Sequence, residues 1–252
     1  MLLNKKIVAF DLDGTLAESK QVITREMSDL LARLLIKTKV IVVSGGSFSQ
    51  YQKQFLPFLP EKGMNKSNLI LLPTCGSQSY EFNSDLNQWQ KIEEVGFLPG
   101  VKKQVIKSLE EIIKSNQYDI PTKTWGEIIE DRGTQITFSA LGQNAPILEK
   151  QKWDPDQIIR QRIKETLVTM ISEVDISIGG MTSVDILPKG HNKAKGLERL
   201  LKRLDYQPDE LVFVGDAIFP GGNDYSVFEA GIETIKVENV KQTAEIIEGW
   251  LS

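Results

Sequence analysis

The chain has 252 residues, with 30 basic and 34 acidic side chains and a formal net charge of −4. This balance gives no general field for polyanions, so we expect no nucleic-acid partner. The single cysteine and single histidine exclude an intramolecular disulfide, a thiolate zinc site and a histidine-rich metal centre. Residues 1–6 are too short and too soon charged for a secretory signal, and no apolar stretch approaches the roughly 20 residues that span a bilayer. We therefore expect a cytoplasmic protein without a membrane partner.

Buried strands and an amphipathic helix alternate in the first third of the chain. The apolar runs 7–10, 40–43 and 69–72 are typical of short buried strands. Thr24 can cap a helix that continues to about Lys37 with a leucine-rich face. This alternation predicts a parallel sheet covered by helices on both faces.

The pattern of apolar and polar residues changes from about Tyr80. Residues 126–131 and 134–139 indicate an antiparallel hairpin, and residues 175–178 and 183–187 indicate another around Gly179-Gly180. Asp154 and Pro155 predict the start of a helix that runs to about Glu173. We interpret this block as an α+β domain, residues 81–187, inserted into a core formed by residues 1–80 and 188–252.

The parallel pattern resumes after the insert. Asn192 can cap a helix through about Leu204, residues 211–214 and 232–237 predict two further strands, and a last helix follows from about Val240. The fold class is therefore α/β, with a doubly wound, Rossmann-like parallel sheet closed by the two outer segments.

The most informative motif is Asp11-Leu12-Asp13-Gly14-Thr15, directly after the first strand. Two carboxylates at such a strand end face the crevice where α/β sheets bind ligands. One of them can attack phosphorus while the other exchanges a proton with the leaving or entering oxygen, and Mg²⁺ can neutralise the phosphate. A solvated turn is the plainer alternative. A calcium loop fits poorly, since Leu12 is unsuitable and the later ligands are missing.

Three other segments fit the same chemistry. Ser44 and Ser47, around Gly45-Gly46 at the end of the second strand, offer hydroxyl and N–H groups for phosphate oxygens. Lys193 lies in the first turn of a predicted helix, where an anionic partner would explain a cation, and Lys189 competes for this role. Asp216 follows another strand and can bind a hard cation. Asp224 can orient Asp216, a metal-bound water or Lys193.

The Asp-x-Asp-Gly-Thr start, the strand-end serine, the lysine and the Gly-Asp…Asn-Asp motif resemble the haloacid dehalogenase superfamily of phosphotransferases. The insert resembles the large α/β cap of one branch of that superfamily. Within that branch, residues 129–142, 179–190 and 213–224 are similar to eukaryotic-type phosphomannomutases and related sugar phosphatases.

The resemblance implies a mechanism through an aspartyl-phosphate. Asp11 would be the nucleophile and Asp13 the general acid and base, with Ser44 and Lys193 neutralising the transferring group. Mg²⁺ would be held by Asp11, the Asp13 backbone carbonyl and Asp216. The other implied site residues are Gly45, Arg132, Gln143, Ser183 and Asp185 for substrate, with Asn223 and Asp224 in support. The partner would be a small phosphorylated metabolite such as a sugar phosphate, and related mutases suggest a homodimer.

The insert departs from the mutase pattern at two positions where the mutases carry arginine. The position that ends the Arg132 motif is arginine in the mutases and Gln143 here, and an arginine expected some ten residues before Arg132 is also missing. Losing a charge-assisted contact costs roughly 1.5–3 kcal/mol. Because a mutase must grip a second phosphate and a hydrolase need not, we rank a Mg²⁺-dependent sugar phosphatase first and a phosphomannomutase second. A non-catalytic sugar-phosphate sensor is the third hypothesis.

Overall fold

The computed structural model describes residues 5–252, and its contacts divide the chain into two compact units. Of the described residues, the first unit comprises 5–94, 192–220 and 224–252, and the second comprises 95–191 and 221–223. Residues 1–4 lie outside the described residues. They belong to the segment 1–6, which we do not expect to act as a secretory signal. Among the described residues, no helix is long and apolar enough to cross a membrane.

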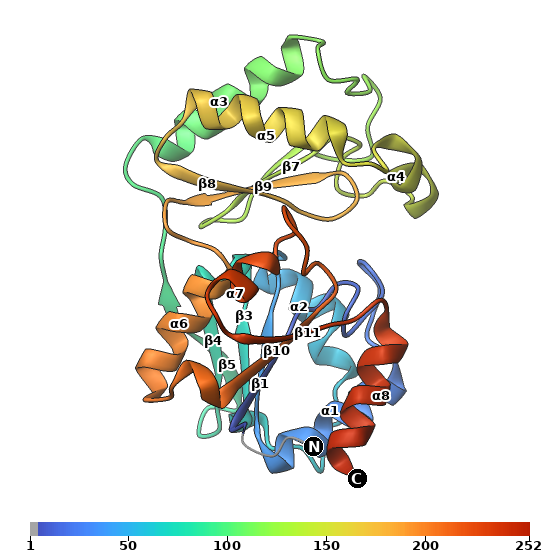
Figure 1. Cartoon of the computed structure of the whole chain (residues 1–252), viewed down its shortest axis with the longest axis vertical. Coiled ribbons are helices and arrows are strands. Elements are labelled where there is room, and N and C mark those ends of the chain that lie inside the picture. Colours follow the sequence, from blue (N-terminus) through green and yellow to red (C-terminus); the bar gives the residue numbers. More distant parts are fainter. Residues whose placement is uncertain (1–4) are drawn as a thin grey trace. The chain divides into compact units, whose positions relative to one another are not determined.

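A seven-stranded sheet forms the centre of the first unit (Figure 1). Phe10 at the end of β1 lies beside Val214 on one neighbour and Val42 on the other, so the carboxyl ends of these parallel strands are level. The last two strands are antiparallel to their neighbours. In spatial order the strands are β11 (Glu233–Lys236), β10 (Leu211–Gly215), β1 (Ile7–Phe10), β2 (Lys39–Val43), β3 (Leu69–Leu72), β4 (Gln78–Asn83) and β5 (Gln88–Glu94).

Helices cover both faces of this sheet, which confirms the predicted doubly wound α/β core. α1 (Arg25–Lys37), α2 (Phe48–Gln54) and α8 (Val240–Leu251) pack on one face. α6 (Lys193–Leu204) and α7 (Tyr225–Glu229) pack on the other face (Figure 1). Alternate residues of the central strands point into the two cores, as strand geometry requires. Four short 3₁₀ helices complete the unit: η1 (Leu56–Phe58), η2 (Lys66–Asn68), η3 (Thr74–Gly76) and η4 (Pro208–Glu210).

The second unit is an α+β domain with an antiparallel four-stranded sheet. Its strand order is β6 (Ile129–Asp131), β7 (Ile136–Ser139), β9 (Ser183–Pro188) and β8 (Val174–Ile178). α3 (Val101–Lys114) and α5 (Ile158–Met170) pack against one face of this sheet through an apolar core, and α4 (Ile147–Trp153) precedes α5. Since side chains alternate along a strand, Thr137 and Ser139 of β7 and Ser183 and Asp185 of β9 point away from this core and form a polar face.

The structure differs from the predicted limits of the insert. Residues 81–94 belong to the first unit, because β4 and β5 extend the central sheet by antiparallel pairing. Their sequence, rich in glutamine and glutamate, shows no apolar run of the kind that predicts a buried strand. On the other side, residues 188–191 fall in the second unit.

The helix predicted from Pro155 to Glu173 begins later, at Ile158, and ends earlier, at Met170. Asp154 still supports its first turn, because its carboxylate accepts hydrogen bonds from the N–H groups of Ile159 and Arg160 (3.0 and 3.1 Å). Residues 155–157 form a turn, and Gln157 has a left-handed φ of 62°, which excludes it from the helix.

Candidate active site

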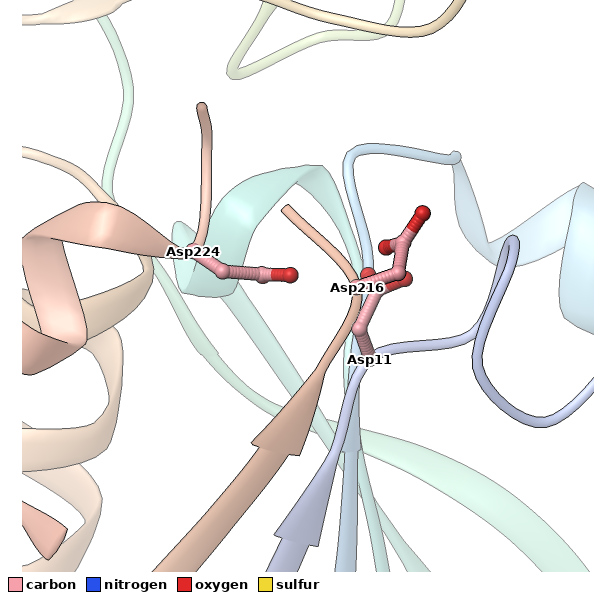
Figure 2. A group of neighbouring side chains, drawn as sticks. All are labelled: Asp11, Asp216 and Asp224. Carbon is pink, nitrogen blue, oxygen red and sulfur yellow. The ribbon is translucent and has the colours of Figure 1, made fainter. Parts of the chain in front are cut away.

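Three carboxylates converge at the carboxyl end of the central sheet. Asp11 follows β1 directly, Asp216 follows β10, and Asp224 immediately precedes α7. One oxygen of each lies within 4.8 Å of the others, and Figure 2 shows Asp11 and Asp216 close together with the Asp224 side chain directed toward them. Asp11 is 4% exposed and Asp224 is fully buried. Two segments about 200 positions apart thus form one acidic site, as predicted from strand ends.

Lys193 neutralises part of this site. It is the first residue of α6. Asn192 caps this helix, because its side chain accepts a hydrogen bond from the N–H of Lys195 (2.9 Å). Its fully buried ammonium group donates to Asp11 Oδ1 and to Asp224 Oδ1, the latter at 2.6 Å. Lys189, the competing candidate, instead pairs with Asp175 at 3.7 Å, with 67% of its side chain exposed. The structure therefore brings Lys193 to the three carboxylates of the first unit, whereas Lys189 belongs to the second unit and pairs with Asp175 there.

The site carries an excess of negative charge. Burial raises the pKa of Asp11 well above its ordinary value, with Lys193 opposing this shift and Asp224 and Asp216 reinforcing it. Burial and the neighbouring Asp224 raise the pKa of Asp216 to about 6. Burial alone would lower the pKa of Lys193, but attraction to Asp11 and Asp224 outweighs it and raises the pKa well above 10.5. Lys193 is thus an ammonium ion at neutral pH, and protons compete for the carboxylates.

The donor set suits a divalent cation. Three ionised carboxylates and one ammonium leave a formal charge of −2, which a divalent ion would neutralise, and carboxylate oxygens are ligands that Mg²⁺ prefers. Asp224 is already engaged by Lys193 and by the N–H of Ala217 (3.1 Å), so it suits an orienting role. Asp11 and Asp216 retain oxygens for a metal ion.

Asp13 is not one of the three clustered carboxylates and has hydrogen-bond partners of its own. One of its oxygens accepts the N–H of Lys20 (2.7 Å) and the other accepts Nε2 of Gln50 (2.8 Å). The next residue, Gly14, has a φ of 90°, and a Cβ there would collide with the Asp216 carboxylate. Gln50 was not singled out from the sequence, because a glutamine in a short helix carries no motif that would distinguish it.

The loop after β2 presents Ser44, Gly45 and Ser47. Ser44 is 2% exposed, and its Oγ accepts a hydrogen bond from the N–H of Gly46 (3.0 Å). Ser47 lies at the N-cap of α2, with its Oγ 3.0 Å from Oγ of Ser49. Ser44 thus faces a folded loop backbone, whereas Ser47 belongs to the start of a helix. Both remain candidates for binding phosphate.

Within the second unit, three of the predicted substrate residues lie on neighbouring strands or next to them. Asp185 accepts hydrogen bonds from Thr137 Oγ1 (2.7 Å) and Gln135 Nε2 (2.9 Å). Ser183 and Gln143 both contact Oγ of Ser139 at 3.0 Å. The Thr137–Asp185 and Ser139–Ser183 contacts follow from the β7–β9 register, which pairs 137 with 185 and 139 with 183. Gln135, Thr137 and Ser139 are therefore additional polar residues beside the predicted set.

Arg132 lies in the connection between β6 and β7. Its Nε and Nη2 both donate to one carboxylate oxygen of Glu130, at 3.0 and 2.7 Å. Asn223 belongs to residues 221–223, which are grouped with the second unit, so its supporting role stays a prediction.

A doubly wound core with an aspartate after its first strand, a buried lysine, an acidic loop after β10 and an inserted α+β domain defines a phosphotransferase of the haloacid dehalogenase class. A family described as eukaryotic phosphomannomutase matches residues 27–251. Phosphomannomutase 1 and phosphomannomutase 2 of Dictyostelium discoideum are 32% and 31% identical, each over 90% of this chain and 88% of the relative. The chain belongs to the eukaryotic phosphomannomutase family.

Solved structures support the fold independently of close sequence similarity. The IMP-nucleotidase of Plasmodium falciparum, in an N-terminally truncated form, superposes with a TM-score of 0.73 at 19% identity. That match covers 98% of this chain and 70% of the other. The family match and the curated relatives favour the mutase hypothesis over the phosphatase that the sequence analysis ranks first.

Proposed function

We propose that this protein is a Mg²⁺-dependent phosphomannomutase, which moves a phosphoryl group between positions 1 and 6 of a hexose through an aspartyl-phosphate. Its membership of the family across residues 27–251 supports the substrate class. The observation that carries the chemistry is the buried Lys193, held between Asp11 and Asp224 at the carboxyl end of the sheet.

In this proposal Asp11 attacks the phosphoryl group. Its Oδ1 is held by Lys193, which leaves Oδ2 to form the bond to phosphorus. As the phosphoryl group approaches, the ammonium of Lys193 offsets the negative charge that builds up on its oxygens. Asp224 holds Lys193 from the other side and so keeps the ammonium directed at the Asp11 carboxylate.

Asp13 moves the proton. Each of its carboxylate oxygens accepts one hydrogen bond and keeps a second lone pair, with which it can take or return a proton. It protonates the leaving hydroxyl in the first half-reaction and removes the proton from the acceptor hydroxyl in the second. The hydrogen bond from Gln50 fixes the carboxylate orientation for both transfers.

The metal would be held by Asp11, Asp216 and the backbone carbonyl of Asp13. When bound, Mg²⁺ supplies charge neutralisation for the phosphate and lowers the repulsion between the nucleophile and its substrate. Ser44 and Gly45 would bind phosphate oxygens through the hydroxyl and the loop N–H groups.

The polar face of the second unit would bind the sugar and its non-reacting phosphate. Asp185 is an acceptor suited to sugar hydroxyls, and Ser183 offers a hydroxyl beside it. Arg132 is the guanidinium that matches the mutase motif, and Gln143 would contribute neutral hydrogen bonds.

A sugar phosphatase is the second candidate, and Gln143 is the observation that favours it. Where the resemblance leads one to expect arginine, this side chain offers an amide that donates to Ser139. After Asp11 has taken a phosphoryl group, a weaker grip on the remaining phosphate would let the sugar monophosphate leave before it accepts the group back. Water would then attack the aspartyl-phosphate, which releases inorganic phosphate and regenerates Asp11.

The two candidates differ in their products. We would supply mannose 1-phosphate with a hexose 1,6-bisphosphate activator and Mg²⁺, and measure mannose 6-phosphate and free phosphate together. Formation of mannose 6-phosphate without matching phosphate release supports the mutase. Stoichiometric phosphate release supports the phosphatase.

Matched variants separate both enzymes from a sugar-phosphate sensor. Asp11→Asn should abolish turnover, whereas Asp29→Asn, at an exposed position of α1, should leave it unchanged. Turnover that persists in Asp11→Asn, or that needs no divalent cation, would contradict the proposed site. Binding of hexose phosphate without any turnover by the wild-type protein would support the sensor.

We also propose a cytoplasmic location and a homodimer, in line with the soluble composition and the resemblance to the mutases. Sedimentation equilibrium at micromolar concentration tests the dimer directly, because a monomer mass of 28.3 kDa would rule it out under those conditions.

A further inference from the structure

The turn that follows β3 has an unusual backbone. Thr74, Cys75 and Gly76 have consecutive positive φ angles of 51°, 53° and 80°. Left-handed backbone is unfavourable for threonine and cysteine because of their Cβ atoms. All three residues are buried. Such a conformation persists only where surrounding contacts determine it.

One side of this turn supports the loop after β2. The N–H of Thr74 donates to the carbonyl of Gly46, and the N–H of Cys75 donates to the carbonyl of Ser44, both at 2.8 Å. The turn therefore fixes the backbone of the loop that carries Ser44 and Gly45.

The other side of the turn lies against helix α6, backbone to backbone. A Cβ built on Gly196 would lie 2.7 Å from Cα of Gly76, and a Cβ built on Gly76 would lie 2.8 Å from Cα of Gly196. Arg199 donates from Nη2 to the carbonyl of Gly76 (2.6 Å) and from Nε to Glu93 (3.1 Å). The two glycines and Arg199 thus set how closely α6 approaches the turn.

Lys193 lies on the same face of α6, three residues before Gly196, and residues with this spacing are neighbours on a helix surface. We propose that Gly76, Gly196 and Arg199 are positioning residues, which hold α6 at the depth that places Lys193 between Asp11 and Asp224. The same turn holds the Ser44 loop, so one element aligns two parts of the site. This inference rests on the proposed function only for the role of Lys193.

The sensitivity of this arrangement follows from its distances. Ordinary van der Waals contacts of a Cβ fall between 3.4 and 4 Å, so an alanine at position 196 requires the backbones to separate. Misplacing a catalytic group by about 1 Å can cost roughly 100-fold in rate. Gly196→Ala should therefore act on Lys193, although position 196 touches no reacting atom.

Gly249→Ala provides the matched control, since Gly249 also lies in a helix and a Cβ there meets nothing within 4 Å. We would compare kcat, the Mg²⁺ concentration for half-maximal activity, and the rate at which a thiol reagent labels Cys75. Cys75 is the only cysteine and is 2% exposed, so its labelling reports opening of the turn.

Gly196→Ala should lower kcat about 10- to 100-fold and accelerate Cys75 labelling at least about tenfold. The Mg²⁺ concentration for half-maximal activity should stay the same. Gly249→Ala should leave all three unchanged. A kcat within about threefold of wild type would overturn the proposal. So would a parallel loss of kcat and Mg²⁺ affinity, which indicates general disruption.

A second pair of variants covers the case in which Gly196→Ala does not fold. Arg199 is 29% exposed in its side chain, so Arg199→Gln should fold. It should lower kcat and accelerate Cys75 labelling, and Arg199→Lys should recover part of both. Wild-type kcat in Arg199→Gln would overturn the proposal.

Failure of the proposed function can be recognised separately. If the wild-type protein does not turn over hexose phosphates, fluoroberyllate with Mg²⁺ probes the Asp11–Lys193 site without any sugar, by fluorine NMR. Gly196→Ala should then lower the affinity for fluoroberyllate at least about tenfold relative to Gly249→Ala. Equal affinity in the two variants would overturn the positioning role.

Discussion

Removing the buried ammonium group of Lys193 should strongly destabilise the protein. When ionised, Asp11, Asp216 and Asp224 carry a formal charge of −3, which Lys193 reduces to −2. Lys193→Met restores −3 at a site shielded from water. Removing one partner of a buried ion pair costs about 3–5 kcal/mol. We expect Lys193→Met to lower the free energy of unfolding by this amount near neutral pH, measured by urea unfolding in the presence of a chelator.

A double-mutant cycle with Asp224→Asn tests whether charge is the cause. The double variant returns the site to a formal −2, so it should be less destabilised than the sum of the single variants, with an interaction energy of about 1–3 kcal/mol. Lys195→Met is the control, because Lys195 pairs with Glu198 at the surface and such a pair contributes about 0–1 kcal/mol. Strict additivity, or a cost of Lys193→Met below about 1 kcal/mol, would refute the electrostatic reasoning.

The pH dependence of this loss has a definite sign. The pKa of Asp216 is raised to about 6, above the ordinary 3.8, so protonating it favours the folded state and stability is gained as pH falls through about 6. The pKa of Lys193 lies well above 10.5, so this ammonium stays charged throughout that range. Protonation of Asp216 removes one of the negative charges that the ammonium offsets. The loss of unfolding free energy caused by Lys193→Met should therefore be smaller near pH 5 than near pH 7.5.

Three further outcomes follow. Because Asp216 must lose its proton to bind a cation, the rise in thermal midpoint on adding Mg²⁺ should be larger near pH 7.5 than near pH 5. Scanning fluorimetry measures this rise, and an equal rise at both pH values would contradict the prediction. Asp13→Asn should lower kcat about 10²- to 10⁴-fold and leave this Mg²⁺-induced rise in place, since its carboxylate lies outside the acidic cluster; unchanged kcat would contradict its role. Arg160→Met should cost about 3–5 kcal/mol in urea unfolding, because it leaves the buried Asp154 unpaired. Lys152→Met, at an exposed pair in the same unit, should cost less than about 1 kcal/mol, and similar costs for the two variants would show that burial is not decisive.

Locally encoded features were predictable from the sequence. A short run of buried β-branched and aliphatic residues specifies a strand wherever it lies in the chain, and the aspartates follow two such runs directly. Since parallel strands end at one edge of a sheet, adjacency of Asp11 and Asp216 followed from the order of the elements. The start of α1 at Thr24 was predictable for the same reason, because a cap is a contact across three residues.

The strands β4 and β5 of the first unit and the helices α3 and α4 of the second unit were not predicted. β5 is mostly exposed and polar, so its strand conformation depends on pairing with β4 and not on an apolar pattern of its own. α3 has an apolar face formed by Val101, Val105, Leu109 and Ile112, a signal at helical spacing that could have located it.

The sequence by itself determined which residues could do chemistry: the acid pair after β1, the acidic loop after β10, and a lysine at the start of a helix. Only the tertiary structure showed that Lys193 reaches the acids and what holds it there. Lys193 contacts Asp11 across 182 positions, and this contact depends on the depth of α6 against the turn at Gly76. That depth is set by the packing of two backbones where side chains are absent, a property that no local pattern of residues encodes.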